Sequence, residues 1–134
     1  MPPTKVLDAF AILAFLYDEP GAEIVHQLIS DAGEGKVNLV MCTVNLGEVW
    51  YWTSRRASPQ TADDSLQELQ EMGIKIVDAD WVLTRQAAIY KTKGNISYAD
   101  TFAAALAKLH GCPVVTGDKE FKQLEGEIEI EWLS

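Results

Sequence analysis

The chain alternates between short apolar segments and longer segments in which apolar residues recur at helical spacing. A short apolar segment bounded by Gly, Pro, Asp or Asn is typical of a buried strand. The strands predicted in this way cover residues 6–7, 37–42, 74–77, 113–116 and 128–133. The longer segments are typical of helices that bury one face. The predicted helices cover residues 9–17, 22–32, 46–56, 61–72, 81–92 and 97–110.

The order of these elements predicts the fold class. Strands and helices alternate as β-α-β-α-β-α-β-β, and helical crossovers between strands favour parallel pairing. We therefore expect one domain over residues 1–134, a three-layer α/β/α sandwich with a mostly parallel central sheet. In the last strand, Glu127, Glu129 and Glu131 alternate with apolar residues, which leaves one face wet. This alternation predicts an edge strand.

The chain is acidic, with 20 Asp and Glu against 11 Lys and Arg and a net charge of −9. Binding to phosphate is driven by Lys and Arg, so this charge argues against tight, nonspecific binding to nucleic acid. It does not exclude a metal-dependent nuclease. Acidic residues that bind divalent cations add to the negative count, and the bound cations reverse the charge locally.

The start of the chain and its cysteines predict a cytoplasmic protein. Residues 1–5 lead directly into the first strand without an apolar signal segment, and no apolar stretch approaches the ~20 residues that span a bilayer. Cys42 and Cys112 lie within apolar runs and match no metal-ligand spacing. We expect both to be free, buried thiols in a reducing compartment.

Acidic residues recur where predicted strands end and the following helices begin. In a parallel sheet these positions share one edge, which is where α/β proteins place their ligand sites. The candidates are Asp8, Glu48, Asp100 and Asp118. Each also has a purely structural interpretation as a helix cap, a capping-box residue or a turn residue.

Two of these acids share a helical face with residues expected to pack. Asp100 shares one with Ala103, Ala104 and Ala107, and Glu48 shares one with two aromatic residues. Carboxylates on packed faces are costly unless a basic partner, a raised pKa or a cation compensates them. Without a cluster of His or Cys nearby, an all-oxygen site suits Mg²⁺ or Mn²⁺.

The segments around these acids resemble the successive motifs of the PIN-domain ribonucleases. They are VLDAFAILA at residues 6–14, VNLGEV at 44–49, YADTFAAALA at 98–107 and VTGDKEF at 115–121. In this order they are similar in particular to the VapC-type toxins of type II toxin–antitoxin pairs. One departure is Phe10, since the family often has a small polar residue two positions after the first Asp. This change removes a hydrogen bond that would support the metal site.

The resemblance implies a Mg²⁺- or Mn²⁺-dependent endoribonuclease that hydrolyses RNA phosphodiesters. It also implies a homodimer and a cognate antitoxin. Its metal-binding and catalytic residues are Asp8, Glu48, Asp100 and Asp118. One or two ions are compatible with this quartet.

Few residues are candidates for contacting the substrate. Arg55 lies nearly on the same helical face as Glu48 and is a candidate phosphate contact, and Thr116 is placed to orient a carboxylate or the attacking water. Glu120 either extends the acidic cluster or is a solvated turn residue. The aromatic segment 50–52 is expected to fill the core or a subunit interface.

Two other functions remain open. One is a PIN-like binding module that has lost catalysis, which the change at Phe10 permits. The other is a receiver-type phosphoacceptor domain, for which Lys119 would follow the last parallel strand, although a single Asp8 and the position of Asp100 fit that class poorly.

Overall fold

The computed structural model describes all residues from 1 to 134 and contains a single five-stranded sheet. The strands are β1 (Thr4–Leu7), β2 (Asn38–Cys42), β3 (Lys75–Val77), β4 (Val114–Thr116) and β5 (Ile130–Trp132). Their order across the sheet is β3-β2-β1-β4-β5, and every neighbouring pair is parallel. The prediction of a mostly parallel sheet is therefore confirmed, and β5 occupies the expected edge.

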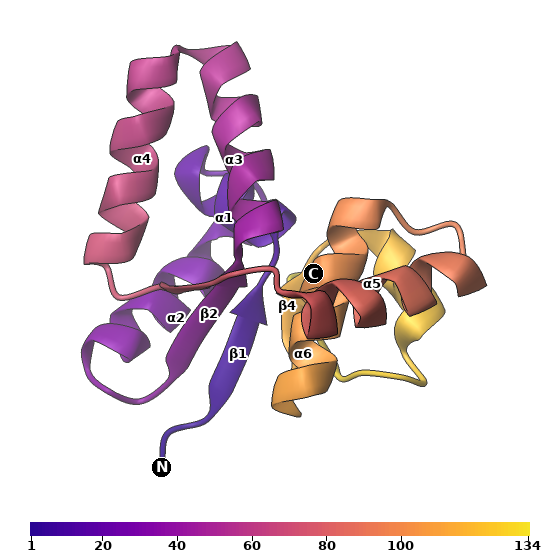
Figure 1. Ribbon diagram of the computed structural model, residues 1–134. Coiled ribbons are helices and arrows are strands. Elements are labelled where there is room, and N and C mark those ends of the chain that lie inside the picture. The colour runs from indigo at the N-terminus through magenta and orange to yellow at the C-terminus, as the bar shows by residue number, and fades with distance from the viewer.

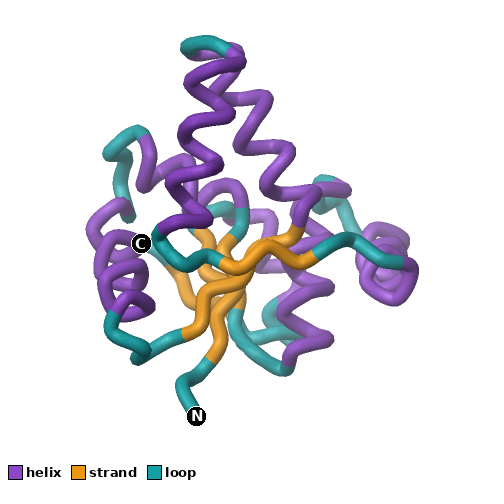
Figure 2. The backbone as a smooth tube through the Cα atoms, turned by 60° about the vertical axis from the view of Figure 1, so that its left-hand side comes forward, coloured by secondary structure: helices purple, strands orange, loops and turns teal.

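Helices cover both faces of this sheet, as Figures 1 and 2 show. They are α1 (Ala9–Leu16), α2 (Ala22–Gly33), α3 (Thr43–Arg56), α4 (Pro59–Glu71), α5 (Trp81–Lys93), α6 (Tyr98–His110) and the 3-10 helix η1 (Lys119–Leu124). One hydrophobic core joins the sheet to α1, α2, α3 and α4, and the other joins it to α5, α6 and η1. All the helices are too short or too polar to span the hydrocarbon layer of a bilayer.

Successive side chains of the central strands point alternately into the two hydrophobic cores. In β1, Val6 belongs to the core beneath α5 and α6, whereas Leu7 belongs to the core beneath α1 and α2. Val114 and Val115 divide in the same way in β4. Because successive side chains of a strand point to opposite faces, a fully apolar strand is required when both faces are covered. This requirement explains why the central strands read as continuous apolar runs.

Some boundaries differ from those expected. Helix α3 begins directly after β2, several residues before the expected start at residue 46. Helix α4 begins at Pro59, because the Ser58 hydroxyl accepts a hydrogen bond from the backbone N–H of Thr61 and proline suits a first helical turn. Segment 119–124, for which no element was expected, forms η1.

Both cysteines are free thiols, as expected. Cys42 is buried, but Cys112 is only half-buried, so the expectation of two buried thiols is wrong for Cys112. The reason is its position in the connection between α6 and the short strand β4, where the chain returns from the surface.

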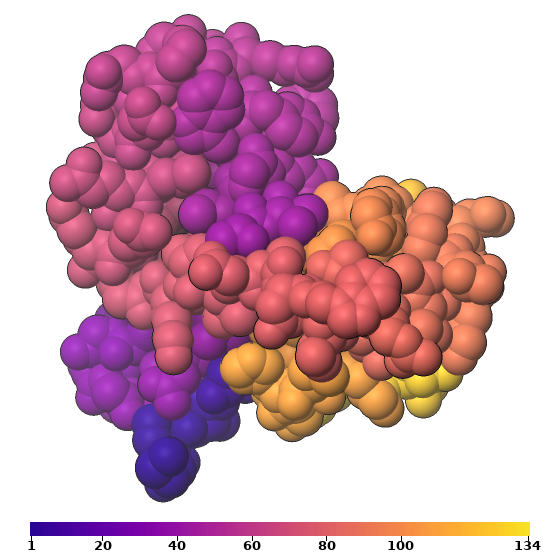
Figure 3. All heavy atoms as spheres, viewed as in Figure 1, coloured from indigo at the N-terminus to yellow at the C-terminus, as the bar shows by residue number.

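Helices α3 and α4 form a hairpin that projects from the body of the molecule (Figures 1 and 3). Its two helices are joined by a hydrogen bond of 2.9 Å from the indole N–H of Trp50 to an oxygen of Asp63. Only the first turns of α3 approach the carboxyl ends of the sheet, because α3 continues directly from β2. The hairpin therefore presents one residue of α3, Glu48, near the edge where the other acids lie.

Candidate active site

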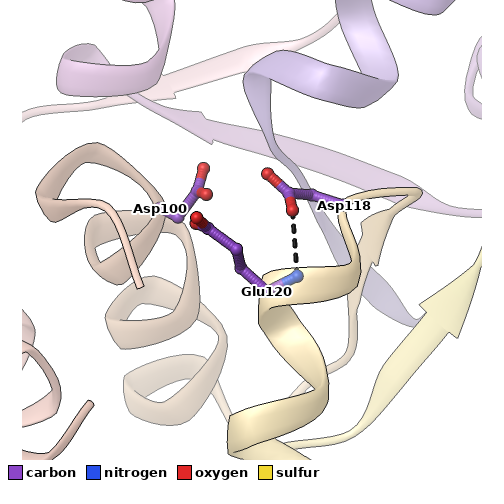
Figure 4. A group of neighbouring side chains, drawn as sticks. All are labelled: Asp100, Asp118 and Glu120. Atoms are coloured by element: carbon purple, nitrogen blue, oxygen red, sulfur yellow. Dashed lines mark hydrogen bonds between the residues drawn. The ribbon is translucent and has the colours of Figure 1, made fainter. Parts of the chain in front are cut away.

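Three acidic side chains meet beside the carboxyl ends of the central strands. Asp100, Asp118 and Glu120 each place a carboxylate oxygen within 4.8 Å of the others. Figure 4 shows the three carboxylates facing a common space from α6, from the loop after β4 and from η1. These three residues are called the acidic cluster below. The topology thus brings together residues that the sequence separates.

Glu120 enters this cluster because of the turn that begins η1. Its backbone N–H donates to Asp118 Oδ1 at 2.9 Å, and its Oε2 accepts a hydrogen bond from the backbone N–H of Ser97 at 3.1 Å. The side chain therefore reaches across to the start of α6. Of the two interpretations of Glu120, this geometry favours membership of the cluster. In the sequence, the signal for this arrangement is an acidic residue two positions after an Asp that caps a turn.

Asp8 lies next to the cluster and has both carboxylate oxygens engaged. It is fully buried; its Oδ1 accepts from the backbone N–H of Ala11 at 2.9 Å, and its Oδ2 accepts from the hydroxyl of Thr116. Burial raises the pKa of Asp8 to about 7, although the bonds from Thr116 and Ala11 oppose this rise. The charges of Asp118 and Glu48 contribute smaller parts of this rise. Asp8 is thus both the cap of α1 and an electrostatic neighbour of two other acids.

Thr116 connects Asp8 with the cluster. Its side chain is fully buried, and its oxygen also accepts a hydrogen bond of 3.0 Å from the backbone N–H of Asp118. One hydroxyl therefore holds a carboxylate on one side and the backbone of another acid on the other. This geometry favours a role in orienting carboxylates rather than direct contact with a substrate.

Glu48 contributes an unpaired oxygen. Its Oε1 is buried and has no hydrogen-bond partner. Burial raises the pKa of Glu48, the neighbouring Asn45 side chain opposes the rise, and the charge of Asp118 adds to it. A buried carboxylate oxygen without a partner is costly, and this one lies beside other acids rather than beside a cation.

Asn45 fixes the start of α3 in place. Its side-chain N–H donates to the carbonyl oxygen of Ala99 at 2.9 Å and thereby ties α3 to the first turn of α6. The alternative interpretation of Asn45 and Glu48 as a capping box is wrong, because α3 begins at Thr43 and Asn45 is already helical. Sequence patterns did not reveal this contact, since it joins residues that are far apart in the chain.

Asp100 is almost completely buried, with 6% of its surface exposed. Its backbone N–H donates to the hydroxyl of Ser97 at 3.2 Å, so Ser97 caps α6 as its position before the helix suggests. Burial raises the pKa of Asp100 strongly, and the charges of Asp118 and Asp8 raise it further. Asp100 therefore resists ionisation as long as no positive charge is near.

The acids have no basic partner. The ion pairs of this structure involve Lys5, Lys36 and Lys93, each with a glutamate elsewhere. None of them includes Asp8, Glu48 or a residue of the acidic cluster. The acidic cluster therefore fits a hard divalent cation such as Mg²⁺ or Mn²⁺, which prefers oxygen ligands. Asp8 and Glu48 lie outside this group of mutually close oxygens.

Arg55, the expected phosphate contact, and its neighbour Arg56 each lie over an aromatic ring. The Arg55 guanidinium is 5.5 Å from the centre of the Tyr51 ring, and Arg56 stacks on Tyr17 at 3.8 Å. Neither arginine bonds to an acid of the site. Lys119 and Lys122 are exposed on η1.

Phe10 lies against the loop that carries Asp118. A Cβ atom at Gly117 would stand 2.3 Å from Cε1 of Phe10, a separation at which atoms overlap. Glycine is therefore required at this position for the ring to occupy its place. The sequence marked Phe10 as a departure from the family pattern, but only the structure shows what its ring contacts.

The parallel sheet, the helices on both of its faces and the carboxylates at the carboxyl ends of its strands define an α/β protein with an acidic site at that edge of the sheet. Within that class, residues 5–127 match the model of the PIN domain. The chain belongs to the PIN domain family.

Solved structures share this fold across the whole chain. VapBC2 from Rickettsia felis, bound to a DNA fragment from its promoter, has a TM-score of 0.75 at 14% identity, covering 96% of this chain and 97% of the other. VapBC from Salmonella typhimurium, also bound to DNA, has a TM-score of 0.74 at 17% identity and covers 100% of both chains. Mycobacterium tuberculosis VapC20, described as a toxin that cleaves the sarcin–ricin loop, has a TM-score of 0.73 at 15% identity, covering 92% and 95%. Comparison with curated protein sequences finds no match.

Proposed function

We propose that this protein is a Mg²⁺- or Mn²⁺-dependent endoribonuclease and the toxin of a toxin–antitoxin pair. The observation that carries the proposal is the acidic cluster, whose carboxylate oxygens lie within 4.8 Å of one another without a basic partner. Membership of the PIN domain family supports it. The family match also argues against the receiver-type phosphoacceptor alternative.

In this proposal, Asp8, Glu48, Asp100 and Asp118 are the metal-binding and catalytic acids, and Glu120 joins them. Bound divalent ions would supply positive charge at the reacting phosphate and lower the pKa of the attacking water. The chain itself contributes positioning. Thr116 holds Asp8 and the backbone of Asp118 in a fixed relation, and Asn45 holds the first turn of α3 against α6.

The substrate and the partner are inferred from chemistry and fold together. RNA is the proposed substrate, and VapC20, which shares the fold, is described as a toxin that cleaves the sarcin–ricin loop. A cognate antitoxin is the proposed protein partner, since several proteins of this fold are found in VapBC complexes. Arg55 remains a proposed phosphate contact at the exposed side of the α3–α4 hairpin.

A second candidate is a PIN-like module without catalysis. The observation that favours it is Phe10, which replaces a small polar residue beside Asp8 with a ring that forms no hydrogen bond. Such a module would retain the fold and a partner, but it would bind divalent ions weakly and leave RNA intact.

One assay distinguishes the two candidates. Purified protein is incubated with unstructured single-stranded RNA in Mg²⁺, in Mn²⁺ and in EDTA, and Asp8→Asn is compared with the unchanged chain. Metal-dependent cleavage that Asp8→Asn lacks supports the nuclease. Intact RNA in both metals, with a protein that is folded by circular dichroism, supports the binding module.

A further inference from the structure

The ring of Phe10 is a half-exposed apolar group beside the acidic cluster. Phe10 is 43% exposed, whereas its neighbours Ala9 and Ala11 are buried. The ring stands two residues after Asp8 and against Gly117, which joins Thr116 to Asp118. The ring therefore offers an accessible aromatic face next to the acids.

The position of the ring is defined by the residues that position the acids. Asp8 caps the first turn of α1 by accepting a hydrogen bond from Ala11, which orients the helical turn that carries Phe10. On its other side the ring meets the backbone of Gly117, leaving no space for a side chain there. A ligand bound at the acids would therefore meet a pre-oriented aromatic surface.

The charges around the site explain why such a surface matters. Asp8, Glu48 and the acidic cluster form no ion pair with Lys or Arg, and Arg55 and Arg56 stack on aromatic rings of their own. Lys119, next to Asp118 in the chain, is an exposed cation. The protein as a whole carries a net charge of −9. The RNA backbone therefore meets few cations at the site, and a second kind of contact would add to its binding. Stacking of a base on an aromatic ring is insensitive to the sign of the charge.

We propose that Phe10 binds a nucleobase of the substrate by stacking and so positions the neighbouring phosphate at the acids. The proposal rests on the nuclease function above and specifies how the site holds a single-stranded nucleic acid. The proposal also explains the departure at Phe10. Where the family often has a small polar residue, this chain has a ring that binds the substrate.

The test separates stacking from every other effect of the ring. Affinity is measured by fluorescence anisotropy with two labelled single-stranded RNAs whose phosphorothioate linkages slow hydrolysis. One RNA has all its bases, and the other has abasic nucleotides through its central part. The variants are Phe10→Leu, which keeps an apolar side chain, and Phe10→Trp, which keeps a ring. Trp81→Leu is the matched control, because Trp81 is 70% exposed on α5, outside the site.

Phe10→Leu should weaken binding of the complete RNA by about fivefold to 100-fold, the range measured for loss of one stacked base. It should bind the abasic RNA as tightly as the unchanged protein does. Phe10→Trp and Trp81→Leu should bind both RNAs without such a loss. Equal weakening for both RNAs would overturn the proposal, because the ring would then support only the site's shape.

Unchanged binding of both RNAs by Phe10→Leu would also overturn the proposal. The experiment measures binding and not cleavage, so its failure is distinct from failure of the nuclease function. That function fails if unmodified RNA remains intact in Mg²⁺ and Mn²⁺, whatever the affinity of the Phe10 variants.

Discussion

The hydroxyl of Thr116 donates a hydrogen bond to the buried carboxylate of Asp8, a residue 108 positions earlier in the chain. The same oxygen accepts from the backbone N–H of Asp118. A single side chain thus fixes the ends of β1 and β4 relative to each other at the edge where the acids lie. Hydrogen bonds of this kind orient metal-binding carboxylates in many proteins.

Replacing Thr116 with valine tests this relationship. Thr116→Val keeps the shape of the side chain but leaves Oδ2 of Asp8 without its donor, so we expect RNA cleavage to fall about tenfold to 100-fold, the range for groups that support metal ligands. Loss of a buried bond to a charged group should also lower the free energy of unfolding by ~1–3 kcal/mol. Thr116→Ser keeps the hydroxyl and serves as the control. Equal cleavage rates for the valine and serine variants would contradict the orienting role.

Asp100→Asn and Asp118→Asn should each abolish RNA cleavage while leaving the fold intact. Both changes remove a negative oxygen from the acidic cluster without changing the size of the side chain. Asp80→Asn is the control, because Asp80 also caps a helix, accepting from the N–H of Leu83 at 2.9 Å, but lies outside the cluster. Cleavage is measured under saturating Mg²⁺. Full activity in either cluster variant would remove that residue from the mechanism.

Thermal unfolding distinguishes metal ligands from simple helix caps. Without metal, Asp100→Asn should remove an acid that burial and the neighbouring acids disfavour, and it should stabilise the protein by ~1 kcal/mol, about the free energy of one pKa unit. Mg²⁺ should raise the melting temperature of the unchanged protein by binding only the folded state, and the variant should show a smaller rise. Melting curves are compared in EDTA and in excess Mg²⁺. If Mg²⁺ shifts neither curve and the variant is less stable in EDTA, the acids are caps and the nuclease proposal loses its basis.

The stability of the metal-free protein should depend on the ionisation of Asp8. Its pKa is 3.8 in the unfolded chain and about 7 in the fold, chiefly because of burial. Between these values the folded protein holds a proton that the unfolded chain has lost, so the free energy of unfolding falls as pH rises through this window. Below it the penalty disappears, and above it the penalty remains in full.

Denaturant titrations in EDTA at a series of pH values measure this dependence. Asp8→Asn cannot ionise, so its free energy of unfolding should lose the part of the slope that Asp8 causes. A difference between the two proteins that is constant across the window would contradict the prediction.

The α3–α4 hairpin should take part in a homodimer. Tyr51 and Trp52 are 42% and 43% exposed and stack on each other, with ring centres 5.8 Å apart. Paired exposed aromatic rings of this kind commonly mark a protein interface. Sedimentation at micromolar concentration should detect a dimer, and Trp52→Glu should dissociate it because the interface would have to bury a charge. Trp81→Glu is the control, and a monomeric unchanged protein would refute the prediction.

Local patterns in the chain determined the secondary structure and the direction of strand pairing. The apolar runs and helical spacing placed the five strands and the six α-helices, because a covered strand must be apolar and a surface helix must be amphipathic. The same alternation required parallel strands, and parallel strands bring Asp8 and Asp118 to one edge. The polar alternation around Ile130 identified the edge strand, since one face of that strand meets water.

Only the tertiary structure decided which side chains meet at that edge. Glu120 joins Asp100 because η1 turns its side chain toward α6, and Asn45 ties α3 to Ala99 instead of capping a helix. The order of strands in the sheet and the rotamers of side chains at its edge determine such contacts, and neither has a local signature in the chain. The same is true of Phe10, whose ring the sequence marked only as the absence of a polar group. Its contact with Gly117 depends on β1 and β4 being neighbours, which requires the folded sheet.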